Sequence, residues 1–319
     1  MVGRKLTAAL VKSGTVGGKQ IDKLTLADVI TPDAVDFSGE VATTAADLSA
    51  PGVAETLIAG RPDLIFHLAA IVSGEAEADF DKGYRINMDG TRYLLEAIRQ
   101  EGMRNAPYVP RLVFTSSIAV FGAPFPEAIG DEFFSTPLTS YGTQKAICEL
   151  LLNDYSRKGF VDGVGIRLPT ITVRPGKPNL AASGFFSNIL REPLSGKEAV
   201  LPVSRDVRHW FASPRAAIGF LLHAAEIDSS KLGWRRTVSA PGLSATVGEE
   251  IEALRRVAGD DVVALIREEP DPTIISIVDG WPRNFDARRA TELGFKAESS
   301  MDEIIRAHIE DELGGKIGG

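Results

Sequence analysis

Two short stretches decide the fold expected of this chain: Leu112-Val-Phe-Thr-Ser-Ser117 and Tyr141-Gly-Thr-Gln-Lys145. The first is apolar and ends in hydroxyl residues, which is typical of a buried strand in a parallel sheet. The second follows a helix-start signal at residues 137–140 and places a phenol and an ammonium one turn apart on a helix face. We expect these groups to meet at the carboxyl end of the strand, where parallel sheets present residues to ligands.

Apolar runs alternate with helical patterns around these stretches. Strands are expected at residues 24–29, 63–70, 111–117 and 164–168, and helices at 53–59, 77–100 and 144–158. This alternation predicts an α/β fold with a doubly wound, Rossmann-type parallel sheet covered by helices on both faces.

Prolines punctuate the chain after Arg167, and helical patterns recur at residues 185–190, 214–226, 247–258 and 301–313. We expect residues 1–166 to form a dinucleotide-binding domain. Residues 167–319 should form mainly a smaller, substrate-binding lobe, with some segments returning to the sheet domain.

Composition excludes several classes of protein. The 319 residues are 44% hydrophobic, enough for a sizeable core, and the net charge of −8 argues against nucleic acid or an anionic membrane as the main partner. No stretch approaches the ~18–20 apolar residues of a spanning helix, and the start lacks the apolar run of a signal peptide. The only cysteine, Cys148, fits a reducing compartment, so we expect a cytoplasmic protein. Four histidines without ligand spacing predict no metal site.

Ser117, Tyr141 and Lys145 are together suited to removing a proton from an alcohol. A tyrosine hydroxyl has an ordinary pKa near ~10, too high for a base at neutral pH. A neighbouring ammonium, and the positive nicotinamide of an oxidised cofactor, both lower the phenol pKa. We therefore expect Tyr141 to act as general base while Ser117 holds the substrate oxygen.

The stretch Phe114-Thr-Ser-Ser-Ile-Ala-Val-Phe-Gly122, followed by Tyr141-x-x-x-Lys145, resembles the extended short-chain dehydrogenase/reductase superfamily of epimerases, dehydratases and dehydrogenases. Further matches cover most of the chain and include Asp47-Leu48, His67-Leu-Ala-Ala70 and Asn87. The resemblance implies catalytic roles for Ser117, Tyr141 and Lys145. It also implies a homodimer built on the helices expected at 77–100 and 144–158.

The cofactor implied is NAD. Asp28 ends a predicted strand, where a carboxylate takes the adenosine ribose hydroxyls and repels the 2′-phosphate of NADP. The candidate cofactor contacts are Gly3, Asp28, Asp47, Leu48, Leu68, Ala69, Ala70, Asn87, Tyr141, Lys145 and Pro169.

The N-terminus departs from the family pattern of a strand followed by G-x-x-G-x-x-G. The sequence passes from Met1-Val-Gly3 directly into a helical pattern at residues 4–11, and Gly3 resembles the last glycine of that turn. The first strand and its phosphate-binding turn are therefore missing from the sequence. Either the sequence starts at an internal methionine of a longer protein, or the protein is a degenerate relative. We expect a polypeptide of only these residues to fold poorly and to bind NAD weakly.

Several longer segments, among them residues 150–163 and 167–179, are similar to the D-erythronate dehydrogenase group. That resemblance implies oxidation of C2 of a small sugar acid, whose carboxylate needs a cation such as arginine. The candidate substrate contacts are Ser73, Ser117, Thr170, Arg174, Asn179 and Arg208. A nucleoside-diphosphate-sugar epimerase or dehydratase, and a non-catalytic NAD-binding relative, remain as alternatives.

Overall fold

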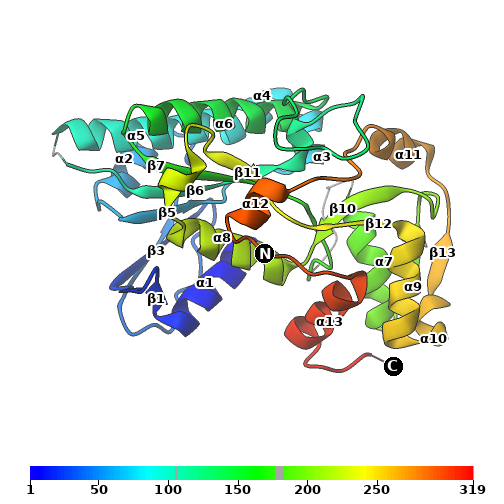
Figure 1. Cartoon of the computed structure of the whole chain (residues 1–319). Coiled ribbons are helices and arrows are strands. Elements are labelled where there is room, and N and C mark those ends of the chain that lie inside the picture. The colour runs from blue at the N-terminus through cyan, green and yellow to red at the C-terminus, as the bar shows by residue number, and fades with distance from the viewer. Residues whose placement is uncertain (105–106, 177–182, 319) are drawn as a thin grey trace.

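The structure, a computed structural model, describes residues 1–104, 107–176 and 183–318. Figure 1 shows a layered region of helices, sheet and helices beside a smaller lobe that contains the carboxyl-terminal helix α13 (Met301–Glu312). The predicted α/β class is confirmed.

The central sheet contains four parallel strands. Their order is β11 (Thr237–Ser239), β7 (Asp162–Leu168), β6 (Arg111–Ser117) and β5 (Leu64–His67). The bounds of β6 are those predicted from the apolar run Leu112–Phe114 and the hydroxyl residues that follow it. In the register of β6 and β7, Ser117 pairs with Leu168, so the two strands end together.

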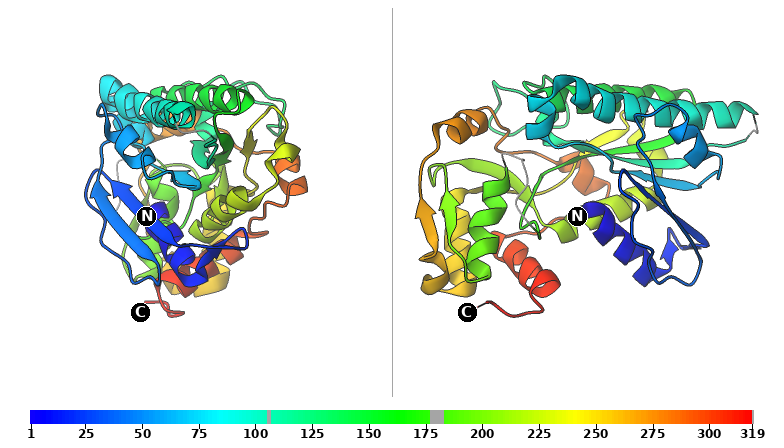
Figure 2. Two further views of the ribbon diagram at one scale, coloured as in Figure 1. Left: turned by 90° about the vertical axis from the view of Figure 1, so that its left-hand side faces the viewer. Right: turned by 180° about the vertical axis from the view of Figure 1, so that it is seen from behind.

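Strand β6 is buried on both faces, and successive side chains serve different layers. Leu112 and Phe114 pack with helices α2 (Val53–Ile58), α5 (Gly90–Arg104) and α6 (Ser140–Arg157). Val113 faces the opposite layer, which contains α1 (Val2–Ser13) and α8 (Pro214–Glu226). The two helical layers lie on either side of the sheet in Figure 2. Each of these three strand residues is at most 1% exposed, so the strand has no free face.

The prediction of one continuous helix over residues 77–100 is wrong. The structure has α3 (Ser73–Ala78), α4 (Phe80–Gly83), a π-helical turn (Tyr84–Asp89) and then α5. The break lies at Asp79, whose backbone is extended and whose side chain accepts a hydrogen bond from the Lys82 backbone N–H. An aspartate that accepts this bond caps the start of a new helix. In the sequence, the same aspartate is equally compatible with an exposed position inside a continuous helix.

Strands β3 (Lys23–Asp28) and β4 (Glu40–Ala45) form a separate parallel pair. Within the described part of the chain, β3 pairs only with β4, and β5 pairs only with β6. Each therefore has one edge without a strand partner. Strand β4 escaped prediction because its Glu-Val-Ala-Thr-Thr-Ala sequence carries little apolar patterning.

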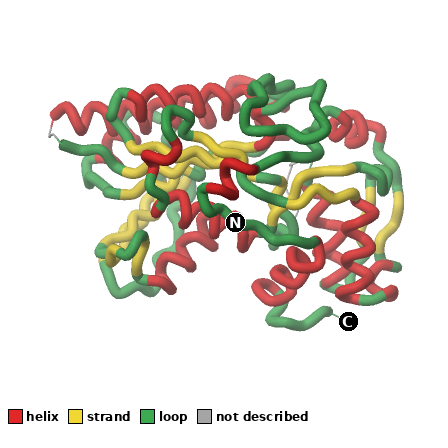
Figure 3. Tube along the Cα trace, in the orientation of Figure 1, coloured by secondary structure: helices red, strands yellow, loops and turns green. Residues whose placement is uncertain are grey.

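The lobe has its own core, formed mainly by α7 (Gly184–Leu194), α9 (Val247–Ala258) and α13 around Phe211 of β10 (Arg208–Ala212). Strand β10 lies between β8 (Thr170–Ile171) and β12 (Leu243–Thr246). Figure 3 distinguishes the remaining elements by type. They are β1 (Thr15–Val16), β2 (Lys19–Gln20), β9 (Ala199–Leu201), β13 (Ile266–Glu268), α10 (Asp260–Val263), α11 (Pro272–Asp279), α12 (Arg288–Glu292) and the 3₁₀ turns Ile118–Val120 and Ser229–Leu232.

No helix in the described ranges is both long enough and apolar enough to cross a membrane.

The divided sheet predicts uneven protection of its backbone. Amides of β6, which has strand partners on both sides, should exchange with solvent more slowly than amides of β3, because strands with an open edge open locally at lower free energy. Hydrogen exchange followed by mass spectrometry of peptides from the two strands measures this difference. Equal protection of β3 and β6 would contradict it.

Candidate active site

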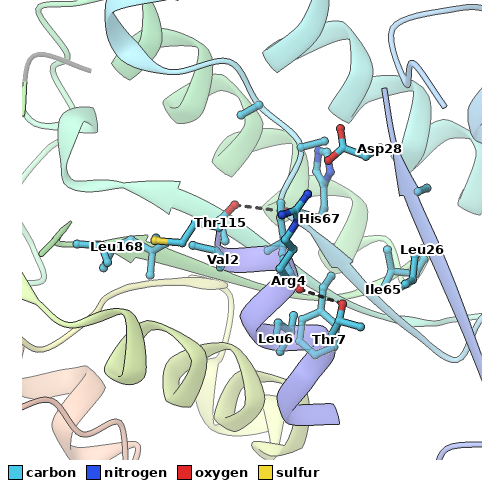
Figure 4. Close-up of a pocket in the computed structure, with 18 of the residues that line it drawn as sticks. Val2, Arg4, Leu6, Thr7, Leu26, Asp28, Ile65, His67, Thr115 and Leu168 are labelled. Carbon is cyan, nitrogen blue, oxygen red and sulfur yellow. Dashed lines mark hydrogen bonds between the residues drawn. The ribbon is translucent and has the colours of Figure 1, made fainter. Parts of the chain in front are cut away.

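One large cavity, of about 2840 Å³, runs along the full length of β3 and β5, passes the carboxyl end of β6 and extends to the lobe. Figure 4 shows part of it, with residues of α1, β3, β5 and β6 directed into the same space. Most of the predicted site residues line this cavity: Gly3, Asp28, Asp47, Leu48, Leu68, Ala69, Ala70, Ser73, Ser117, Tyr141, Lys145, Pro169, Thr170 and Arg174.

The groups predicted to be catalytic come together at the end of β6. Thr139 caps α6 by accepting a hydrogen bond from the Gly142 N–H, which fixes the first turn that carries Tyr141. The Lys145 Nζ donates to the Thr115 carbonyl of β6 at 2.8 Å and lies 5.8 Å from the centre of the Tyr141 ring. The Ser117 hydroxyl lies close enough to Tyr141 to lower the pKa of the phenol, and it accepts a hydrogen bond from the Ala119 N–H.

Burial governs the charge states of this group. It raises the pKa of Tyr141 to about 12, against the opposing effect of the Ser117 hydroxyl. It also lowers the pKa of Lys145 to about 8, although Cys148 and Glu149 act in the opposite direction. For the protein alone the pKa of the phenol is raised rather than lowered, because desolvation dominates and the lowering effect of Ser117 is smaller.

A buried ion pair fixes α6 against β6 and β7. The Arg167 guanidinium of β7 donates to both carboxylate oxygens of Glu149, at 2.7 Å for the shorter contact, and the Ser116 hydroxyl donates to the same carboxylate. Glu149 lies one helical turn after Lys145. The pair therefore helps to hold the helix that carries Lys145 in a fixed position on the sheet.

At the other end of the cavity lie the carboxylates expected to contact the adenosine. Asp28 ends β3 and accepts a hydrogen bond from the Val29 N–H at 2.7 Å. Asp47 accepts from the backbone and hydroxyl of Ser49, and the hydroxyl bond is the main cause of its lowered pKa. Gly3 lies in the first turn of α1, where a side-chain Cβ would stand 3.8 Å from Leu68 at the end of β5.

Asn87 does not line the cavity. Its side chain is 2% exposed, accepts from the Ile71 N–H at 2.8 Å and donates to Gln144. It therefore fixes the chain that follows β5, where Ala70 lines the cavity, and its predicted role as a direct cofactor contact is not supported by its position.

Arg174 is the cation at the lobe end of the cavity. Its guanidinium reaches only the hydroxyls of Ser187 and Ser183, each at 3.4 Å, and no carboxylate pairs with it among the described residues. Burial, with a smaller effect of Arg191, lowers its pKa. Arg191, in contrast, is neutralised by Glu192. Arg174 is therefore a half-buried positive charge with no carboxylate partner among the described residues.

Arg208, the other arginine predicted to bind substrate, does not line the cavity. It donates to the Ser244 carbonyl and lies 3.3 Å from Glu249. Successive side chains of a strand point to opposite faces, and the next residue of β10, His209, lines the cavity instead. No strand was predicted at residues 208–212, so the sequence did not indicate which of these side chains faces the cavity, and His209 was missed. Asn179 lies outside the described residues.

The residues of the cavity fit a dinucleotide. A strand-end carboxylate, a helix N-terminus and a buried lysine follow one another along a space that borders three parallel strands. Within the described ranges, no group of three or more histidine, cysteine, aspartate or glutamate residues could hold a metal ion.

Comparison with known proteins gives relatives over almost the whole length. A protein of Cupriavidus necator named D-erythronate dehydrogenase is 48% identical over 97% of this chain and 95% of its own. A protein of Haemophilus influenzae with the same name is 44% identical over 98% of this chain and 96% of its own.

Solved structures agree with these matches. A crystal structure described as the nucleoside-diphosphate-sugar epimerase from Agrobacterium tumefaciens is 69% identical, covers 99% of this chain and 92% of its own, and superposes with a TM-score of 0.97. The L-threonine dehydrogenase of Clostridium difficile, 23% identical with a TM-score of 0.84, shares the fold. Residues 1–230 match a family described as NAD dependent epimerase/dehydratase, and the chain belongs to that family.

Proposed function

We propose that this chain oxidises the C2 hydroxyl of D-erythronate to the 2-oxo acid with NAD. The observation that carries the proposal is the single cavity that joins Tyr141, Ser117 and Lys145 to the unpaired cation of Arg174. An alcohol base and a carboxylate-binding group so combined suit a small hydroxy acid. The names of the two relatives from Cupriavidus necator and Haemophilus influenzae support the same substrate.

In this reaction the substrate hydroxyl lies against Ser117 and Tyr141. Tyr141 removes the hydroxyl proton while Ser117 hydrogen-bonds the same oxygen and keeps it in place. When bound, NAD accepts the hydride from C2, and its positive ring favours the tyrosine phenolate. Since burial alone raises the pKa of Tyr141 to about 12, the phenol needs nearby positive charge to act as a base, and Lys145 supplies part of it.

Arg174 is the group that we assign to the substrate carboxylate. Its two hydroxyl neighbours, Ser183 and Ser187, do not neutralise it. A carboxylate placed there would gain charge-assisted hydrogen bonds. Arg208 already has Glu249 and the Ser244 carbonyl as partners and faces away from the cavity.

The cofactor contacts proposed are the predicted residues that line the cavity, with Asp28 at the adenosine ribose. A carboxylate at that position disfavours the phosphate of NADP, so NAD is the preferred cofactor. We also propose a cytoplasmic homodimer that pairs α5 and α6 of two copies. Leu150, a 69% exposed leucine on α6, supports this interface, because large apolar side chains at helix surfaces favour association.

A nucleoside-diphosphate-sugar epimerase is the second candidate. The description of the Agrobacterium tumefaciens structure favours it, and so does the large volume of the cavity. A dehydratase is less well supported, because Thr115, Ser116 and Ser117 at the end of β6 supply no carboxylate for acid–base work.

Turnover distinguishes the two candidates. With D-erythronate and NAD we expect absorbance at the wavelength of NADH to rise, and with NADP the rate should be much lower. The same assay across sugar acids of four to six carbons, together with binding of UDP- and TDP-sugars, provides the comparison. Tight binding of a nucleotide sugar without oxidation of any sugar acid would overturn the proposal.

Substitution Tyr141→Phe removes the phenol hydroxyl and keeps the ring. We expect kcat to fall by about 10²- to 10⁴-fold, the usual contribution of a positioned general base, with an unchanged circular dichroism spectrum. The matched control is Tyr155→Phe on the same helix, whose hydroxyl donates to Glu96. It should retain kcat, and an equal loss in both variants would contradict the assignment.

The buried charge of Lys145 predicts a pH dependence of stability. Its pKa is lowered from 10.5 to about 8, so between these pH values the unfolded chain binds a proton that the folded chain does not. The free energy of unfolding should therefore rise with pH from about 8 toward 10 because of this group. Tyr141, whose pKa is raised from 10 to about 12, lowers stability only above pH 10.

Urea unfolding between pH 7 and pH 9.5 measures this effect. The rise should be lost in Lys145→Met and kept in Lys158→Met, which changes an exposed lysine at the end of the same helix. Identical pH dependence in the two variants would show that Lys145 does not carry it.

A further inference from the structure

His209 and Thr170 form a hydrogen-bonded pair in the wall of the cavity, at the lobe end. The His209 Nε2 and the Thr170 hydroxyl oxygen are 2.6 Å apart. They come from neighbouring parallel strands, since β8, which begins at Thr170, pairs with the end of β10. Both residues line the cavity, and His209 takes no part in the proposed proton transfer.

Aromatic rings fix the orientation of the imidazole. The Phe186 ring stacks on it with centroids 5.1 Å apart and an interplanar angle of 2°. Phe211 meets it edge-on at 5.5 Å, and Trp281 lies at 5.3 Å. With His209 only 2% exposed, its ring cannot turn away from Thr170 without repacking this cluster.

The imidazole is uncharged at neutral pH, because burial lowers the pKa of His209 to about 4, with a smaller opposite effect of the Pro282 backbone. A neutral imidazole has one donor and one acceptor nitrogen. Nδ1 has no well-formed hydrogen bond within the described residues. Because proline has a carbonyl but no backbone N–H, the effect of Pro282 favours the proton on Nδ1. We therefore assign the proton to Nδ1, which makes Nε2 the acceptor of a hydrogen bond from the Thr170 hydroxyl.

A hydroxyl that donates its proton to Nε2 can only accept a hydrogen bond from a ligand. The chain places Thr170 two residues after Leu168, which pairs with Ser117, and four residues before Arg174. Thr170 therefore belongs to the segment that connects the reacting end of the cavity with its cation. A hydroxyl donor on the substrate is the group that matches it.

We infer that His209 is a positioning residue that holds Thr170 as the acceptor for a second substrate hydroxyl, beyond the one oxidised, and so selects polyhydroxy acids over deoxy acids. This inference rests on the proposed function. It adds a determinant of specificity, because a buried acceptor left without its donor penalises the analogue that lacks the hydroxyl.

The test compares kcat/KM for D-erythronate with that for 2,3- and 2,4-dihydroxybutanoate of the same C2 configuration, each lacking one further hydroxyl. The wild type should favour D-erythronate over one of them by at least about 10- to 100-fold. Thr170→Val should remove most of this preference, through a higher KM for D-erythronate, and leave the deoxy acid within about threefold. His209→Phe should do the same, and His209→Gln, which keeps an acceptor, should restore part of it.

Thr172→Val is the matched control, because Thr172 is fully buried, pairs with Ser187 and does not line the cavity. It should affect all three acids equally. Equal effects of Thr170→Val on all three acids would overturn the inference and leave the proposed function intact.

If the wild type oxidises no sugar acid, the proposed function fails, and binding then decides the inference. Dissociation constants for the three acids, measured by calorimetry on wild type and Thr170→Val, should show the same loss of preference. Equal affinities of the wild type for all three acids would overturn the inference.

Discussion

Burial of β6 on both faces is the constraint on which the rest of the structure depends. Leu112, Val113 and Phe114 are closed off by one helical layer or the other, so this strand can offer chemistry only at its end. Ser117 lies there, and the bond from Lys145 to the Thr115 carbonyl ties α6 to the same strand. The geometry of the site is thus inherited from core packing rather than from flexible loops.

Lys145 and Arg174 are two of the cations that line the cavity, and their surroundings differ. Lys145 has a backbone carbonyl and a nearby carboxylate, and Arg174 has only hydroxyls. Removing charge from water without pairing it is costly. A site whose cations are desolvated without a ligand is suited to an anionic ligand. A small acid would compensate these charges better than a neutral sugar. The net negative charge of the whole chain does not indicate that this part of the cavity is positively charged.

Sequence predicted those features that depend on local pattern. Strand β6 and helix α8 have the predicted bounds because the apolar run Leu112–Phe114 with its hydroxyl end, and a Ser-Pro helix start, are clear local signals. The break at Asp79 was not predictable, since an aspartate has the same sequence signal as a cap and as a solvated residue. Arg208 was preferred to His209 because an arginine suits a carboxylate, and only the neighbours of β10 settle which side chain faces the cavity. The direction of the Tyr141 pKa depends on depth of burial, which a motif does not contain.

Because the cavity lies between β3 and β5, a ligand bound in it would affect the stability of the fold as well as turnover. Both strands border the cavity, so a ligand that contacts both would join the two parts of the sheet where no backbone hydrogen bonds do. Binding of this kind stabilises the folded chain by mass action, in proportion to the logarithm of ligand concentration over its dissociation constant. The lifetime of the protein against proteolysis would then follow the cellular level of that ligand, which makes abundance as well as rate responsive to it.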